Sequence, residues 1–288
     1  MLAAPMALVL VFQYLPMAGI IMAFQDYLPN QGFYVFGSEF VGFANFARLF
    51  ADAEVWRVMR NTVIIAVLKI ILGTVFPITV AVLLNEVGKL WFKRGVQTAI
   101  FLPYFISWVI MSGVLMRLFS SDSGIVTVLF RNIGITIPKY FEDASAFPSL
   151  VIFSNLWKDS GYGVVVYLAA ITTIDPTLYE AAKIDGAGHF KRCVHITLPG
   201  MLPVIILLTV LNMGNVLNAG FEQVFNLYNE MVYSTGDILD TYIYRKAFGQ
   251  AHDYSFATAV GLLKSVISLV FISAAYIIAQ KKYDYRIF

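Results

Sequence analysis

Residues 174–200 read IDPTLYEAAKIDGAGHFKRCVHITLPG, and this segment lies between two long apolar stretches. Asp175 followed by Pro176 is typical of a helix start, because aspartate caps free N–H groups and proline fits the first turn. Glycine and aspartate then predict a turn before helix-compatible residues resume. We therefore expect two short helices, at 177–184 and 189–197, joined by a turn at 185–188.

The composition of this loop suits close contact with another surface. Small side chains leave room for an approaching partner, at Ala181, Ala182 and Ala187. Charged side chains surround them, at Glu180, Lys183, Lys191 and Arg192. The residues alone leave two interpretations open, which are a docking element and an ordinary interfacial loop with helical character.

The stretches that flank the loop are apolar enough to cross a membrane, which takes about 20 mostly apolar residues. Six such windows are present, at 1–24, 61–84, 96–119, 150–173, 201–220 and 257–280. The first window lacks the basic leading segment of a signal peptide and has a longer apolar core, so we interpret it as a spanning helix. A native start would often place basic residues before such a span, which leaves open whether Met1 is the native start. The predicted fold is an all-α integral membrane protein with about six transmembrane helices, in a single domain over 1–288.

The composition of the whole chain agrees with a membrane protein. Of 288 residues, 59% are hydrophobic and only 13% are charged, whereas soluble domains carry about 25% charged residues. The net charge of +2 is too small to indicate a nucleic-acid partner. One cysteine and three scattered histidines predict no metal site. No phosphate-binding GxxxxGK[ST] loop is present, so we expect no ATP site in this chain.

The loop charges predict the orientation. With both termini in the cytoplasm, the inner segments 86–96, 174–200 and 281–288 hold 9 Lys and Arg in 46 residues. The outer segments 25–60, 120–149 and 221–257 hold 7 in 103 residues, together with 12 Asp and Glu. This bias places 174–200 in the cytoplasm.

Several polar residues fall within the predicted spans. Asp159, beside Lys158, is the one acid there; we expect the pair near the outer end of its helix, with a passage wall as the alternative. Lys69, Arg117 and Lys264 have corresponding interpretations, and snorkelling or pairing with another subunit is favoured for most of them.

Asparagines in the spans are candidate sugar ligands, because sugars are recognised by amides, hydroxyls and aromatic faces. Asn212, Asn215 and Asn218 recur every three residues and are predicted to share one face of a helix. Together with Asn155 and Trp157 they are the candidate passage residues, and Tyr104 and Tyr162 are weaker ones. Hydrogen bonding between helices or to a partner permease is the alternative.

The loop 174–200 resembles the EAA loop of ABC-importer permeases, whose pattern is EAA, three residues, G, nine residues, I, one residue, LP. Seven fixed positions match over 20 residues: Glu180, Ala181, Ala182, Gly186, Ile196, Leu198 and Pro199. Asp185 and Ala187 also fit. Further stretches resemble the LplB-like carbohydrate branch of the MalF/MalG type, namely VGFANF (41–46), LPYFISW (102–108), WKDSGYG (157–163), 167–187, HITLP (195–199) and DTYIYR (240–245). An alginate-type importer subunit lies within this branch.

The resemblance implies a binding-protein-dependent importer of oligosaccharides in the bacterial cytoplasmic membrane. The loop would dock on a separate ATPase, with Glu180 facing a basic residue and Gly186 making the turn. The implied partners are a homologous second permease, two ATP-binding subunits that hold ATP and Mg, and an extracytoplasmic solute-binding protein. An ion- or proton-coupled secondary transporter and a membrane-embedded structural or sensory subunit are the alternatives.

Overall fold

The computed structural model describes residues 2–29, 37–214 and 217–283, and most of these residues are helical. The chain divides into two compact units. The first unit comprises 1–62 and 237–267, and the second comprises 63–236 and 268–288. Helices α3 (Ala53–Glu86) and α14 (Tyr254–Tyr283) contribute residues to both units.

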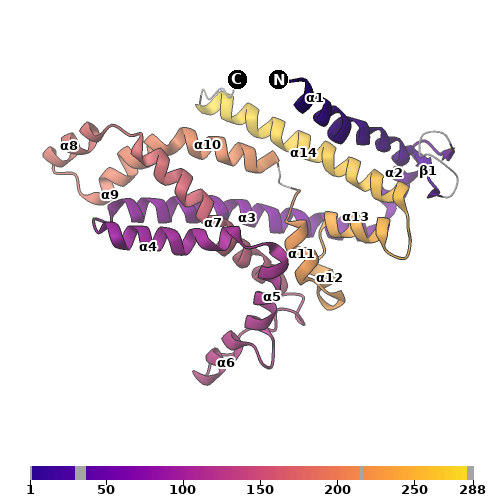
Figure 1. Ribbon diagram of the computed structural model, residues 1–288, viewed down its shortest axis with the longest axis horizontal. Coiled ribbons are helices and arrows are strands. Elements are labelled where there is room, and N and C mark those ends of the chain that lie inside the picture. The colour runs from indigo at the N-terminus through magenta and orange to yellow at the C-terminus, as the bar shows by residue number, and fades with distance from the viewer. Residues whose placement is uncertain (1, 30–36, 215–216, 284–288) are drawn as a thin grey trace. The chain divides into compact units, whose positions relative to one another are not determined.

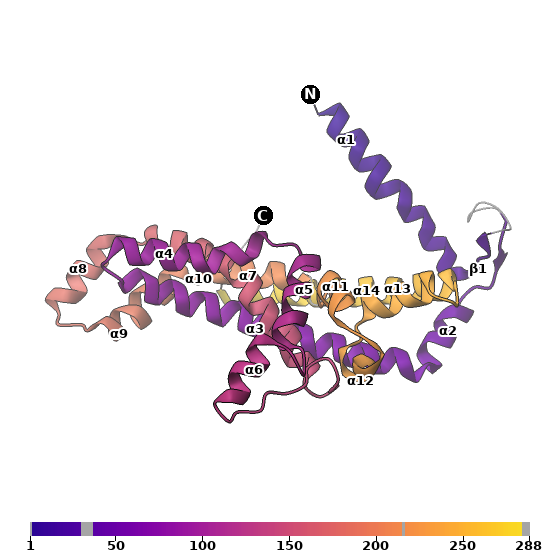
Figure 2. The ribbon, with the colours of Figure 1, turned by 60° about the horizontal axis from the view of Figure 1, so that its bottom comes forward.

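The first unit begins with three consecutive helical segments, α1 (Ala3–Val9), η1 (Leu10–Tyr14) and η2 (Leu15–Phe24). A two-stranded antiparallel pair follows, β1 (Gln25–Asp26) with β2 (Glu39–Phe40), and then α2 (Ala44–Ala51). The remaining helix is α13 (Leu239–Phe248), whose position beside α14 is visible in Figures 1 and 2. Asn45 of the VGFANF stretch donates to the carbonyls of Ala23 and Gln25, at 3.1 and 3.0 Å. This amide therefore satisfies main-chain groups where η2 ends.

The second unit contains the remaining helices. In chain order they are α4 (Leu90–Phe101), η4 (Leu102–Phe105), α5 (Trp108–Phe119), α6 (Ile125–Asn132), α7 (Phe147–Thr172), α8 (Pro176–Ile184), α9 (His189–Arg192), η5 (Cys193–Thr197), α10 (Leu198–Gly214), α11 (Phe221–Leu227), η6 (Glu230–Val232) and α12 (Tyr233–Gly236). Its core packs side chains of α3, α7 and α10, including Ala81, Tyr167 and Met201. Figure 2 shows α4 running beside the later part of α3.

Four described helical stretches are long and apolar enough to cross a membrane: Ala3–Phe24, Ala53–Glu86, His189–Met213 and Tyr254–Ile278. Two bent pairs raise the number to six if each pair is one span. One pair is Leu90–Phe105 with Trp108–Phe119, bent by 107°, and the other is Phe147–Thr172 with Pro176–Ile184, bent by 71°. The predicted helical membrane fold is confirmed.

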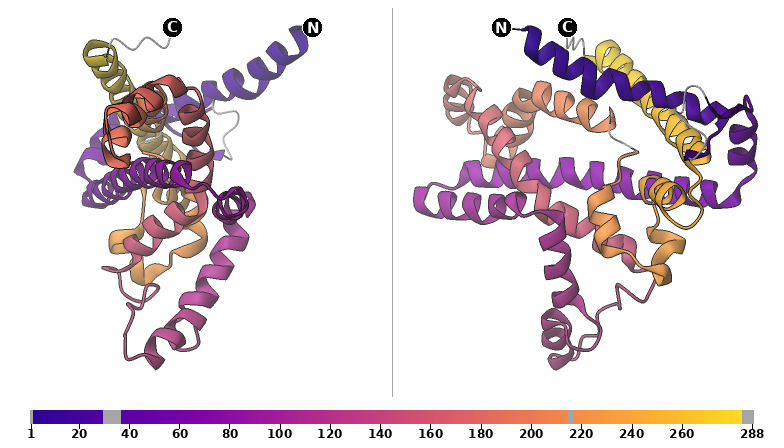
Figure 3. Two further views of the ribbon diagram at one scale, coloured as in Figure 1. Left: turned by 90° about the vertical axis from the view of Figure 1, so that its left-hand side faces the viewer. Right: turned by 45° about the vertical axis from the view of Figure 1, so that its right-hand side comes forward.

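The third predicted span, 96–119, is wrong as a single helix. The chain turns between η4 and α5, so that α5 leaves the direction of α4 (Figure 3). Ile106 and Ser107 are both extended there, and the Ser107 hydroxyl caps α5 by accepting from the Ile110 N–H at 3.4 Å. The helix also begins earlier than expected, because α4 starts at Leu90.

The fifth predicted span, 201–220, is also corrected. Helix continues without a break from His189 to Met213, and α10 ends at Gly214. Asn218 therefore lies beyond the helix, and the predicted stripe of three asparagines on one helical face is wrong. The reason is the non-helical stretch 217–220, whose last residue, Gly220, has a φ of +96° that favours glycine.

Candidate functional site

The loop between α7 and α10 has the predicted local structure. Asp175 caps α8 by accepting from the Thr177 N–H at 2.9 Å, and this hydrogen bond lowers the pKa of the Asp175 carboxyl. The turn after α8 is made by Gly186, whose φ is +73°. Figure 1 shows α8 and α9 as separate short helices joined by this turn.

The motif residues differ in exposure and in the helix that carries them. Glu180, Ala181, Asp185 and Gly186 are exposed, whereas Ala182 and Ala187 are half-buried. Ile196 lies in η5, and Leu198 and Pro199 open α10. The Tyr179 hydroxyl lies 3.0 Å from the Thr197 hydroxyl, which ties α8 to η5.

Large apolar side chains are exposed on the same loop. Ile184 is 87% exposed, Phe190 81% and Leu178 51%. Sequence reasoning considered only the alanines and charges, and it missed these three residues. Exposed apolar side chains beside a charged rim are typical of an interaction surface.

A second feature is a cavity of about 390 Å³ that lies wholly within the second unit. Its wall combines amide, charged and aromatic side chains, including Asn155, Asn212, Asn218, Lys69, Asp159, Tyr104, Trp108 and Tyr162. The Tyr104 and Tyr162 rings stack, with centroids 5.6 Å apart and planes inclined by 18°. Amides next to aromatic faces provide both kinds of contact that a sugar ring uses.

Of the five candidate passage residues, the structure brings three together on this cavity, namely Asn155, Asn212 and Asn218. Asn215 lies outside the described residues. Trp157 faces a separate, mostly apolar cavity of about 290 Å³, together with Leu115 and Phe153. Trp157 is therefore not brought together with the three asparagines.

The charged residues of the spans differ from expectation. Asp159 and Lys158 lie in the middle of α7 rather than near its end, and Asp159 lines the cavity and receives a hydrogen bond from Asn155. Lys69 and Lys264 do not depend on lipid headgroups or another subunit for a partner. The Lys69 ammonium donates to Gln223 at 2.5 Å, and Lys264 pairs with Asp240 at 2.5 Å. Arg117 is exposed.

Gln223 is a cavity-supporting residue that sequence reasoning missed. It is fully buried and donates to the Val151 carbonyl at 2.7 Å and the Ser154 hydroxyl at 2.8 Å. The sequence signal that could have indicated Gln223 is its position three residues after Gly220, at the start of α11. Because both acceptors belong to α7, the buried Gln223 amide links α11 to α7.

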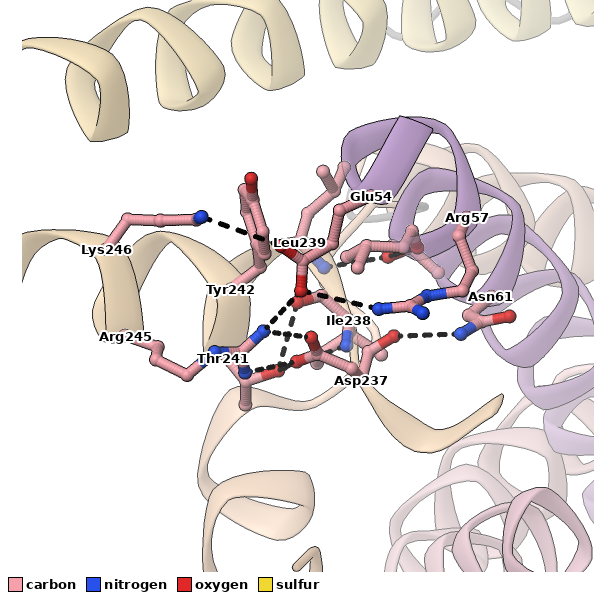
Figure 4. A network of polar contacts seen from close by, with 12 residues as sticks. Glu54, Arg57, Asn61, Asp237, Ile238, Leu239, Thr241, Tyr242, Arg245 and Lys246 are labelled. Carbon is pink, nitrogen blue, oxygen red and sulfur yellow. Dashed lines mark hydrogen bonds and ion pairs between the residues drawn. The ribbon is translucent and has the colours of Figure 1, made fainter. Parts of the chain in front are cut away.

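A third polar feature lies within the first unit, where α13 meets the start of α3 (Figure 4). Arg245 bonds both Asp237 and Glu54, and Lys246 lies 3.5 Å from Glu54. The Tyr242 hydroxyl donates to Asp52 at 3.0 Å, and burial followed by this neighbouring carboxylate raises its pKa far above the ordinary value. The network gives a structural role to Tyr242 and Arg245 of the DTYIYR stretch.

Comparison with known proteins agrees with the predicted resemblance. A family model described as "Binding-protein-dependent transport system inner membrane component" matches residues 73–282. Protein LplB of Bacillus subtilis (strain 168) is 41% identical over 272 residues, which are 94% of this chain and 85% of LplB. The polygalacturonan/rhamnogalacturonan transport system permease protein YteP of the same strain is 39% identical over 272 residues, 94% of this chain and 84% of YteP.

A solved structure extends this likeness to three dimensions. It is a chain of a bacterial alginate ABC transporter in complex with an alginate pentasaccharide-bound periplasmic protein. The TM-score is 0.91 at 34% identity, and the match covers 100% of this chain and 95% of the other.

Proposed function

The chain belongs to the family of binding-protein-dependent transport system inner membrane components, and from this premise we propose that it forms half of the passage of an ATP-driven oligosaccharide importer. It is a multi-pass permease subunit of the bacterial cytoplasmic membrane, of the sugar-transporting branch. In the proposed complex a homologous permease supplies the other half, and two ATP-binding subunits hold ATP and Mg.

The observation that carries this proposal is the exposed helix–turn–helix at 176–192. Glu180 is exposed on α8, and Ile184 and Phe190 are exposed on the same loop. In the proposed mechanism these apolar side chains enter a cleft of the ATPase, while Glu180 pairs with a basic group there. Because helix is continuous from His189 to Met213, closure of the ATPases would move α10 together with the loop.

The residues that line the cavity are proposed to form part of the wall of the sugar passage. Its asparagines would hydrogen-bond the hydroxyl groups, and the stacked Tyr104 and Tyr162 would contact the apolar face of a sugar ring. A solute-binding protein would deliver the sugar from the extracytoplasmic side. Here Asn155, Asn212 and Asn218 are proposed ligands, and the roles proposed for Asn215 and Trp157 stay predictions.

Among oligosaccharides, those with uronic acids are the proposed substrates. YteP is named for polygalacturonan and rhamnogalacturonan transport, and the matched structure is of an alginate transporter.

The test is reconstitution of the chain with its partner permease, ATPases and binding protein in vesicles. We expect ATP hydrolysis to rise when the binding protein is loaded, and oligogalacturonate or oligomannuronate uptake to exceed that of neutral oligosaccharides. Uptake without ATP that follows a proton gradient would instead support a secondary transporter. Absence of both sugar uptake and ATPase stimulation would instead favour a structural or sensory subunit.

A further inference from the structure

Non-helical backbone interrupts the helical structure at two places beside the cavity, and at each place main-chain groups lack helical partners. One lies at Ile106 and Ser107, between η4 and α5, and the other lies at 217–220, directly before α11. In a membrane such groups must be satisfied by protein or by water in a cavity, because lipid offers no hydrogen bonds. The groups that satisfy them therefore control where the broken segments lie.

Lys158 of α7 satisfies a main-chain carbonyl at the first interruption. Its ammonium donates to the Tyr104 carbonyl at 3.1 Å, two residues before the break. The residue is only 7% exposed, and its nitrogen lies 5.5 Å from the Tyr104 ring centroid and 5.2 Å from that of Trp108. One lysine thus contacts an aromatic residue on each side of the break, Tyr104 and Trp108, through a hydrogen bond and cation–π contacts.

Lys69 of α3 likewise satisfies a main-chain carbonyl at the second interruption. Its ammonium donates to the Ala219 carbonyl at 2.6 Å and to the Gln223 amide oxygen at 2.5 Å. A Cβ atom at Gly220 would lie 2.9 Å from the Lys69 nitrogen, so the glycine permits this approach. Two of the three ammonium donors are therefore used within the protein.

We propose that Lys69 and Lys158 are positioning residues of the passage. Each stands on a helix that is continuous at that point. Lys158 holds the Tyr104 carbonyl at the end of η4, and Lys69 holds the Ala219 carbonyl in the non-helical stretch before α11. Lys158 thereby fixes Tyr104 and Trp108, and Lys69 fixes the segment that carries Asn218, so that aromatic and amide groups face one cavity. This inference rests on the proposed function, since it assigns these groups to sugar transport.

The experiment compares charge-removing and donor-retaining variants in the reconstituted importer. Lys158→Met and Lys69→Met remove the donor, whereas Lys158→Gln keeps an amide donor and Lys69→Arg keeps a charged one. Lys139→Met, which removes an exposed lysine that pairs only with Glu142 at 3.2 Å among the contacts described, is the matched control. The measured quantity is the number of sugar molecules imported per ATP hydrolysed.

We expect each Met variant to lower sugar imported per ATP on the order of tenfold, the size expected for a lost hydrogen bond from a charged donor. Binding-protein-stimulated ATP hydrolysis should stay within about twofold of the original, because the loop that meets the ATPase is unchanged. Lys158→Gln and Lys69→Arg should recover most of the loss, and Lys139→Met should cause none. The loss should be equal for acidic and neutral oligosaccharides.

Unchanged sugar per ATP in both Met variants would overturn the inference, as would equal loss in the donor-retaining and Met variants. A loss in Lys69→Met confined to acidic sugars would assign Lys69 to substrate binding instead. If a Met variant fails to assemble, the donor-retaining variant of the same lysine carries the test, and its failure to couple counts against the inference. Absence of sugar uptake in the unmodified importer would contradict the proposed function itself.

Discussion

The carboxylate of Asp237, which is fully buried, receives two hydrogen bonds from the Arg245 guanidinium, at 2.6 and 3.2 Å. The Thr241 hydroxyl adds a third at 2.7 Å. A buried carboxylate is stable only if its charge is compensated, and here the compensation joins the start of α13 to its last turn. The same Arg245 bonds Glu54, at the start of α3.

Arg245→Met is expected to lower the free energy of unfolding by about 3 kcal/mol, because it leaves the Asp237 charge buried without its partner. Denaturation in detergent of the purified chain measures this change. The matched control is Arg57→Met, because Arg57 is exposed and pairs with Glu54 at 3.3 Å. Its expected cost is below about 1 kcal/mol. Equal costs for the two variants would contradict the role given to Asp237.

Gly186→Pro and Glu180→Lys are expected to uncouple ATP hydrolysis from transport in the assembled importer. The φ of +73° at Gly186 cannot be reached by proline, which is held near −65°. Glu180→Lys reverses the charge that would face the ATPase. Sugar uptake and ATP hydrolysis, measured together in vesicles, check both variants.

Gly188→Ala is the control for the turn. Its φ of −67° suits alanine, and a Cβ there would meet nothing within 4 Å. Coupling should therefore be retained in Gly188→Ala.

Normal coupling in a correctly assembled Glu180→Lys variant would count against the proposed contact between Glu180 and the ATPase.

Local sequence signals were sufficient for the loop but not for the cavity. A capping Asp175, Pro176 and a glycine turn act over a few residues, so the two short helices could be predicted. The interruptions of 96–119 and 201–220 are stabilised by Lys158 and Lys69, which are distant in sequence. No pattern within an apolar window reveals a partner that comes from another helix.

Residues that line the cavity were predictable only where their position within a helix was correct. Asn155 and Asn212 were predicted from polarity within apolar spans, and both line the cavity. The helical spacing assumed for Asn218 failed because α10 ends at Gly214. Trp157 lies two residues after Asn155 on α7, and on a helix that spacing points side chains in different directions.

Gly161→Ala is expected to impair folding and assembly, because α7 approaches α4 closely at this position. A Cβ would lie 2.5 Å from the Ile100 carbonyl oxygen and 2.7 Å from the Phe101 Cα, both of them main-chain atoms. Gly95→Ala on α4 is the control, since its Cβ would meet nothing within 4 Å. The yield of monodisperse complex measures both, and a normal yield for Gly161→Ala would show that the helices can separate there without cost.

Asn218→Leu is expected to reduce sugar uptake more than it reduces assembly. The residue is exposed on the wall of a cavity of about 390 Å³, beyond the end of α10, so a leucine there has room. Loss of one neutral hydrogen bond to a sugar hydroxyl corresponds to about 1 kcal/mol, or roughly a fivefold fall in uptake. Uptake normalised to the amount of purified complex gives the measurement, and Asn226→Leu, which changes a half-buried residue of α11 absent from the cavity lining, is the control. Should the complex fail to form while the control assembles, Asn218 acts in packing between helices or subunits and not in the passage.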